Sequence, residues 1–112
     1  MRKHVLISTD SIGRSNRELG EILIRSFLHT LARAEPRPLS LMLMNEGVRL
    51  ACEGSKVEED LRLLVDAGVP VKACGTCLDF LGLGEKLIVG EVGNMAGTVE
   101  TLLGDECVVT VG

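Results

Sequence analysis

The sequence predicts an α/β protein: a three-layer α/β/α sandwich around one five-stranded parallel sheet. Short apolar segments alternate with segments of helical periodicity, and the apolar segments lack the polar alternation of half-exposed strands. Successive apolar segments are separated by roughly a dozen residues or more, which is enough for crossover helices between parallel strands. The five expected strands are residues 5–8, 39–44, 69–73, 87–89 and 107–111.

The first two helices are each introduced by a capping box. In this motif a hydroxyl and a carboxylate three residues later satisfy each other's free backbone donors. Ser15 with Glu18 predicts the start of the first helix, and Ser55 with Glu58 predicts the start of the second. The expected buried stripes are Leu19, Ile22, Leu23, Phe27 and Leu31 in the first helix, and Val57, Leu61, Leu64 and Val65 in the second.

Two further helices have simpler signals. Thr76 followed by Asp79 is a weaker capping box, and Asn94 is a fourth N-cap. Glycine is typical of the residue just after a helix, so we expect helices to end near Gly68, near Gly82 or Gly84, and near Gly104.

Composition favours one globular domain, residues 1–112, and excludes several classes of function. Of the 112 residues, 46% are hydrophobic but 2% are aromatic, which is too few for base-stacking surfaces. The net charge of −4 and the scattered basic residues offer no cationic stripe for nucleic acid. Without a signal pattern or a run of about 20 apolar residues, we expect a cytoplasmic protein with no membrane partner.

The predicted topology locates a site. Ligands of parallel sheets bind beyond the carboxyl ends of the strands, where residues 9–15, 45–55, 74–77 and 90–95 should meet. From these loops we take as candidate substrate-binding residues Asp10, Arg14, Asn45, Gly75, Thr76, Asn94 and Met95.

Cys74 and Cys77 are the candidate catalytic residues. If Thr76 caps the short third helix, Cys77 is its first residue and Cys74 lies just before it. The positive end of the helix would then favour the thiolate form of both, as a nucleophile at cytosolic pH requires. Two small buried thiols at a strand end are the alternative interpretation.

Two other roles for these thiols fit less well. A thioredoxin-like couple needs a proline downstream of the CxxC, yet Pro36, Pro38 and Pro70 all precede it. A zinc site needs further ligands, but no second CxxC is present, and Cys107 should start a strand at the opposite end of the sheet. We therefore expect neither a metal nor another cofactor, and we assign no role to His4 or His29.

Longer stretches carry a family resemblance. The stretch CGTCLDFLGLGEKLIVGEVGNM, residues 74–95, with RELGEILIRSFLHTL and NEGVRLACEGS, resembles DsrE-like domains, most closely the C-terminal domain of YedF-type sulfurtransferase-like selenium-metabolism proteins. The resemblance implies a five-stranded sheet of flavodoxin-like architecture, homo-oligomers, and a persulfide carried on Cys74, with Cys77 in place of a small residue. YedF-type proteins usually carry a TusA-like sulfur-carrier domain before this one. A separate TusA-like protein is therefore an expected partner.

Together these observations predict a cysteine-dependent sulfur carrier or transferase, with selenium as an alternative cargo. Cys74 would accept the sulfur and pass it to a partner thiol, while Cys77 resolves or assists. Two alternatives stay open: a non-catalytic subunit that binds a partner or an anion at the same edge, and a CxxC thiol-disulfide oxidoreductase.

Overall fold

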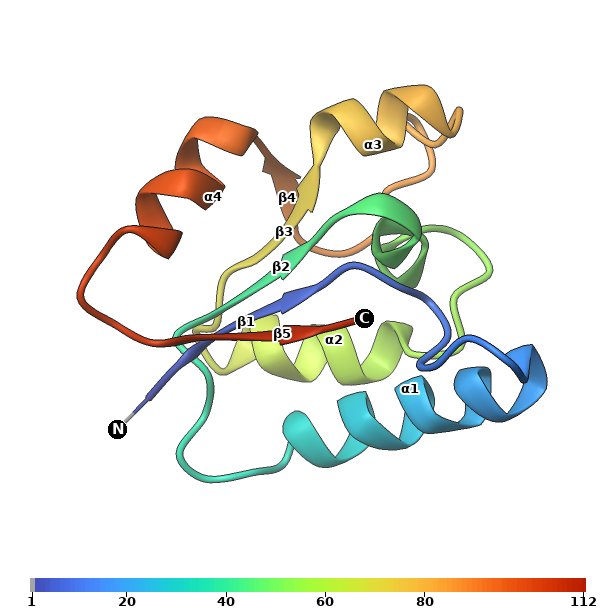
Figure 1. Ribbon diagram of the computed structural model, residues 1–112, viewed down its shortest axis with the longest axis horizontal. Helices are drawn as coiled ribbons and strands as arrows, with labels where there is room; N and C mark the ends of the chain where they lie inside the picture. The colour runs from blue at the N-terminus through green and yellow to red at the C-terminus, as the bar shows by residue number, and fades with distance from the viewer. Residues whose placement is uncertain (1) are drawn as a thin grey trace.

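The computed structural model describes residues 2–112, and it contains the predicted sheet. All five strands are parallel, in the order β4-β3-β2-β1-β5, so β4 and β5 form the two edges (Figure 1). The strands are β1 (His4–Ile7), β2 (Ser40–Leu43), β3 (Val71–Cys74), β4 (Glu91–Gly93) and β5 (Val108–Val111).

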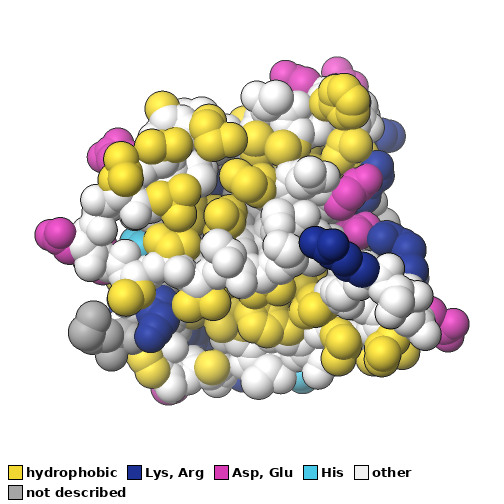
Figure 2. Space-filling model, in the orientation of Figure 1, with side chains coloured by type: hydrophobic (Ala, Val, Ile, Leu, Met, Phe, Trp, Pro, Cys, Tyr) yellow, Lys and Arg dark blue, Asp and Glu magenta, His cyan; other side chains and the backbone are white. Residues whose placement is uncertain are grey.

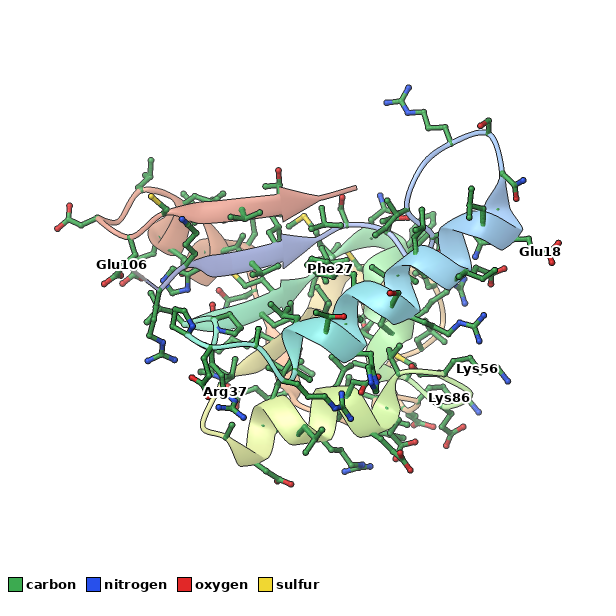
Figure 3. All side chains as sticks on the ribbon, turned by 90° about the horizontal axis from the view of Figure 1, so that it is seen from below. Glu18, Phe27, Arg37, Lys56, Lys86 and Glu106 are labelled. Carbon is green, nitrogen blue, oxygen red and sulfur yellow. The ribbon has the colours of Figure 1, made fainter. Side chains whose placement is uncertain are left out.

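Helices cover the two faces of the sheet unequally. They are α1 (Arg17–Leu31), the 3-10 helix η1 (Asn45–Ala51), α2 (Glu58–Asp66), α3 (Gly75–Phe80) and α4 (Met95–Leu102). Figure 3 shows α1 and α2 side by side along one face, and Figure 1 shows α4 apart from both. The connection from β4 to β5 runs back across the sheet, against the direction of the earlier crossovers, so right-handed crossovers place α4 on the other face.

The core lies between the sheet and the pair α1 and α2. Alternate strand residues point to this face, because successive side chains of a strand point to opposite sides. They pack with side chains of both helices into one cluster that includes Val5, Ile7, Leu41, Leu43, Val71, Ala73, Ile24, Leu28, Leu61 and Leu64.

The buried stripe of α1 differs from the predicted one. Gly20, Ile24 and Leu28 are its buried residues, whereas Leu19 and Ile22 remain 51% and 49% exposed. The backbone N–H of Ile12 donates to the Gly20 carbonyl at 3.0 Å, which brings the loop after β1 tightly against Gly20. This contact sets the rotation of the helix; Leu23 is also exposed, and Phe27 and Leu31 lie partly buried beside the core.

The caps of α1 and α2 are shifted from their predicted positions. Asn16, not Ser15, caps α1, since its side-chain oxygen accepts a hydrogen bond from the Leu19 amide at 2.9 Å. Ser55 accepts from the Val57 amide at 3.1 Å, so it closes a turn just ahead of α2 rather than capping the helix. The Asn94 cap is confirmed, with its side chain accepting from the Gly97 amide at 2.7 Å.

The predicted glycine ends of the helices agree with the structure. Gly68 and Gly82 follow α2 and α3 with positive φ angles of 87° and 71°, a conformation that suits glycine. Gly104 follows Leu103 at the end of α4.

The fourth strand was predicted four residues too early. Residues 87–89 do not join the parallel sheet: Leu87 forms an isolated antiparallel bridge with Cys52, and Val89 is buried in the core. The true edge strand β4 includes exposed Glu91 and Val92, so it lacks the apolar character that predicts a strand. Gly90 therefore precedes β4 and lies at the amino end of the sheet, not at the predicted site edge.

Of the helices within residues 2–112, none is both long and apolar enough to cross a membrane.

Candidate functional site

Cys74 lies where β3 passes directly into α3. It is the last residue of the strand and the N-cap of the helix, so α3 begins at Gly75 and includes Thr76. The predicted cap at Thr76 is wrong, and Cys77 is the third residue of the helix. A Cβ atom at Gly75 would lie 3.1 Å from the Val92 side chain and 3.4 Å from the Gly93 carbonyl oxygen, so a small residue suits the close approach of β4.

The two thiols of the CxxC differ in exposure. Cys74 is 9% exposed and Cys77 is half-buried, and both are free. The backbone N–H of Asn45 points at the Cys77 sulfur, with a nitrogen–sulfur distance of 3.1 Å. Asn45 opens η1 in the left-handed conformation, with φ of 51°, which few residues other than glycine adopt. This turn after β2 brings a backbone donor to the thiol pair.

The environment of Cys77 keeps its sulfur protonated. Burial raises the pKa of the Cys77 thiol, and a hydrogen bond with Cys74 raises this pKa further, whereas the hydrogen bond from Asn45 lowers it. The net shift is upward. For Cys77 the expectation that the helix end favours the thiolate is therefore wrong, because desolvation of the charged form outweighs the donors aimed at it.

A groove leads from Cys74 along the second face of the sheet. It has a volume of about 390 Å³ and lies between α4 and the strands. Asn94 lines it at the N-terminus of α4, and Met95 beside it is 56% exposed. The groove is lined by Leu6, Met42 and Lys72 from the sheet and by Gly97, Thr98 and Thr101 from α4, among others.

Asp10 and Arg14 take a different position from the other candidate residues. Asp10 pairs with Arg17 at 2.8 Å and lines a second cavity, of about 370 Å³, near Ile24 of α1 and the residues that follow η1. Neither thiol of the CxxC lines that cavity. Arg14 is exposed in the loop before α1. Asn45, Gly75, Thr76 and Asn94 are the candidates that the structure brings to the thiol pair or to its groove.

The other two cysteines lie apart from this pair. Cys52 is buried, its thiol donates to the Val48 carbonyl with a sulfur–oxygen distance of 3.2 Å, and burial raises its pKa. Cys107 is exposed just before β5, at the opposite end of the sheet, as expected. Within residues 2–112, no group of three or more His, Cys, Asp or Glu side chains is placed to hold a metal ion.

Sequence reasoning missed two features of the groove. Lys72 is an exposed lysine within the otherwise buried strand β3, and Gly93 lies beside it in β4. A charged residue inside an apolar strand was the available signal, because Lys is seldom placed where both faces are covered. The 3-10 helix that carries Asn45 had no comparable signal.

Comparison with known proteins reveals likeness at the level of structure. Neither a protein-family model nor a curated protein matches the sequence. The structure of the YchN protein from Escherichia coli aligns with a TM-score of 0.68 and 26% identity, over 98% of this chain and 99% of that one. MTH1491 from Methanobacterium thermoautotrophicum, a protein of unknown function, aligns with a TM-score of 0.70 and 23% identity, over 97% of both chains. BT1422 from Bacteroides thetaiotaomicron, also of unknown function, aligns with a TM-score of 0.60 and 14% identity, over 96% of this chain and 94% of that one.

Proposed function

We propose that this chain is a sulfur carrier or transferase, with selenium as an alternative cargo. Its sheet order and helices are those of the DsrE-like fold, which YchN and MTH1491 share. The observation that carries the proposal is the pair of free thiols at the carboxyl end of β3, with the groove reaching Cys74 and the Asn45 amide directed at Cys77.

The proposed reaction has two balanced steps. The Cys74 thiolate attacks the outer sulfur of a donor persulfide, and the donor leaves as its thiolate with the electron pair of the broken S–S bond. The persulfide on Cys74 then passes its outer sulfur to an acceptor thiolate, and the Cys74 thiolate is released. Cys77 is the neighbouring thiol that can attack the same persulfide, forming a Cys74–Cys77 disulfide and releasing hydrosulfide.

Intact mass spectrometry after incubation with a low-molecular-weight persulfide donor tests this function. We expect a gain of about 32 Da that reductant removes, in the manner of other reversible thiol modifications. Cys74→Ser should abolish the adduct, and Cys77→Ser should keep it for longer because the resolving thiol is gone. Cys107→Ser is the matched control for an exposed cysteine outside the site. An adduct that persists in Cys74→Ser would remove Cys74 from its role.

Cys74 and Cys77 are both free, and the neighbouring Cys74 thiol raises the pKa of Cys77, so the pair also favours a second candidate, a thiol-disulfide oxidoreductase. This function predicts a loss of about 2 Da on oxidation and equal dependence on both cysteines. The third candidate is a subunit that only binds a partner or an anion at this edge. It predicts neither mass change, with both thiols alkylating no faster than free cysteine.

The partner is proposed to be a second copy of the chain together with a separate TusA-like sulfur-carrier protein. Support for self-association comes from α4, Met95–Leu102, none of whose residues is buried although four are apolar: Met95, Ala96, Val99 and Leu102. Leu103, just beyond the helix, is also exposed. Figure 2 shows hydrophobic side chains gathered over α4 and the strands beside it. Large apolar surfaces of this kind mark contact sites.

A further inference from the structure

Lys72 lines the groove under α4, and the proposed sulfur transfer gives this lysine no role. Lys72 and Cys74 lie two residues apart on β3, so both side chains are directed to the same face, with their Cα atoms about 7 Å apart. Both residues line the groove. The positive charge of Lys72 therefore belongs to the same site as the thiol.

The path of the Lys72 side chain leads toward the thiol end of the groove. In the sheet register Lys72 is opposite Glu91, and Cys74 is opposite Gly93. A Cβ atom at Gly93 would lie 3.1 Å from Cβ and 3.8 Å from Cδ of Lys72. The aliphatic stem of Lys72 thus runs beside Gly93, the register partner of Cys74, and the missing side chain of Gly93 leaves room for it.

The ammonium group of Lys72 is available to bind an anion, because none of the ion pairs found within residues 2–112 includes it. Glu91 also lines the groove, yet none of these pairs joins it to Lys72. His4 lines the groove at the amino end of the strands, where its Nδ1 lies 2.6 Å from Ser40 Oγ. The groove therefore combines an available ammonium group with the thiol of Cys74.

We infer that Lys72 binds the anionic group of the sulfur donor, and that the donor is a small thiosulfate-type compound. The inference rests on the proposed function of Cys74. The Cys74 thiolate attacks the outer sulfur of thiosulfate, the S–S bond breaks, and sulfite leaves with its electron pair: RS⁻ + SSO₃²⁻ gives RSS⁻ + SO₃²⁻. Lys72 offsets the repulsion between the thiolate and the dianion. A groove of about 390 Å³ accommodates an anion of this size.

Two sulfur donors of different charge distinguish an effect of the Lys72 charge from a change in the reactivity of Cys74. Thiosulfate is an anion, whereas methyl methanethiosulfonate is neutral, and a thiolate attacks both at a sulfur bonded to a sulfonyl group. Mass spectrometry gives the rate of each adduct on Cys74. For Lys72→Met we expect the thiosulfate rate to fall about tenfold or more, as the loss of a nearby unit charge predicts, with little change in the rate for the neutral donor. Lys72→Arg should restore most of the thiosulfate rate.

Lys56→Met is the matched control, because it removes the same charge at an exposed lysine of the other cavity (Figure 3). An equal effect of Lys56→Met and Lys72→Met, or an equal loss with both donors, overturns the inference. So does a wild-type protein that reacts with a persulfide donor but not with thiosulfate, and in that case the proposed carrier function stands. If no donor modifies Cys74, the carrier function itself fails, and the assignment of Lys72 fails with it.

Discussion

The two thiols of the CxxC have unequal surroundings, and this inequality assigns their roles. Cys74 lines the groove, whereas Cys77 accepts a hydrogen bond from the Asn45 amide. The raised pKa of Cys77 keeps it a thiol at neutral pH. A thiol that ionises late is a poor first nucleophile but a suitable second one, acting once Cys74 has taken up sulfur.

Replacing Cys74 should therefore change the titration of Cys77. In Cys74→Ala, the hydrogen bond and the charge of the neighbouring sulfur are lost, and both raise the pKa of Cys77. The pH at which Cys77 alkylation reaches half its maximal rate should move to lower pH, though not fully to the ordinary thiol value of about 8.5, because burial remains. The pH dependence of iodoacetamide labelling, followed by peptide mass spectrometry, measures this midpoint. Cys52→Ala should leave the midpoint in place, and a shift to higher pH in Cys74→Ala would contradict the explanation.

A single side chain caps the N-terminus of a helix, so two neighbouring polar residues can compete for the capping position. Before α1, Ser15 and Asn16 are both good capping types, and the structure uses Asn16. The capping-box pattern predicted Ser15 because Glu18 follows it by three residues. The observed hydrogen bond runs instead from the Leu19 amide to the Asn16 side chain.

A pair of substitutions distinguishes these two caps. Asn16→Ala should lower the free energy of unfolding by about 1 kcal/mol, the usual effect of losing a capping side chain. Ser15→Ala should change it by much less, because this side chain is exposed before the cap. Urea denaturation of both variants measures the difference. A larger loss for Ser15→Ala would restore the predicted cap.

At the scale of the whole molecule, one face of the sheet is well packed and the other is only partly covered. The face under α1 and α2 contains the large buried side chains, whereas α4 lies over the groove on the other face. The radius of gyration is 13.0 Å, so this asymmetry occurs within an ordinary small fold rather than an extended one. An unburied apolar helix beside a strand edge is the surface at which we expect copies to associate.

A charge placed on this surface should prevent association. Val99→Glu in α4 is expected to sediment as a 12.0 kDa monomer, while the unchanged protein sediments as an oligomer at micromolar concentration. Leu63→Glu in α2 is the control, because Val99 and Leu63 are both 42% exposed. A wild-type protein that is monomeric, or two variants with the same effect, would argue against association through α4.

The fold and the thiol position were predictable because they depend on local patterns. Apolar runs, helical periodicity and connection length predicted five parallel strands. Cys74 lies at the carboxyl edge of the sheet because it is the last residue of β3. The fourth strand was placed wrongly because edge pairing, not hydrophobicity, selects Glu91–Gly93. The buried stripe of α1 was placed wrongly because several apolar stripes fit the same helix.

The amino-acid sequence determines the class of this protein: its strands, its crossovers and the thiol pair at a strand end follow from residue types and spacings. Only the tertiary structure decides how that pair behaves. The Asn45 amide reaches Cys77 through a left-handed turn in a segment distant along the chain. The stem of Lys72 passes beside Gly93 through the register of two strands. Desolvation and charge act over a few ångströms in space, and these distances between remote segments exist only once the chain has folded.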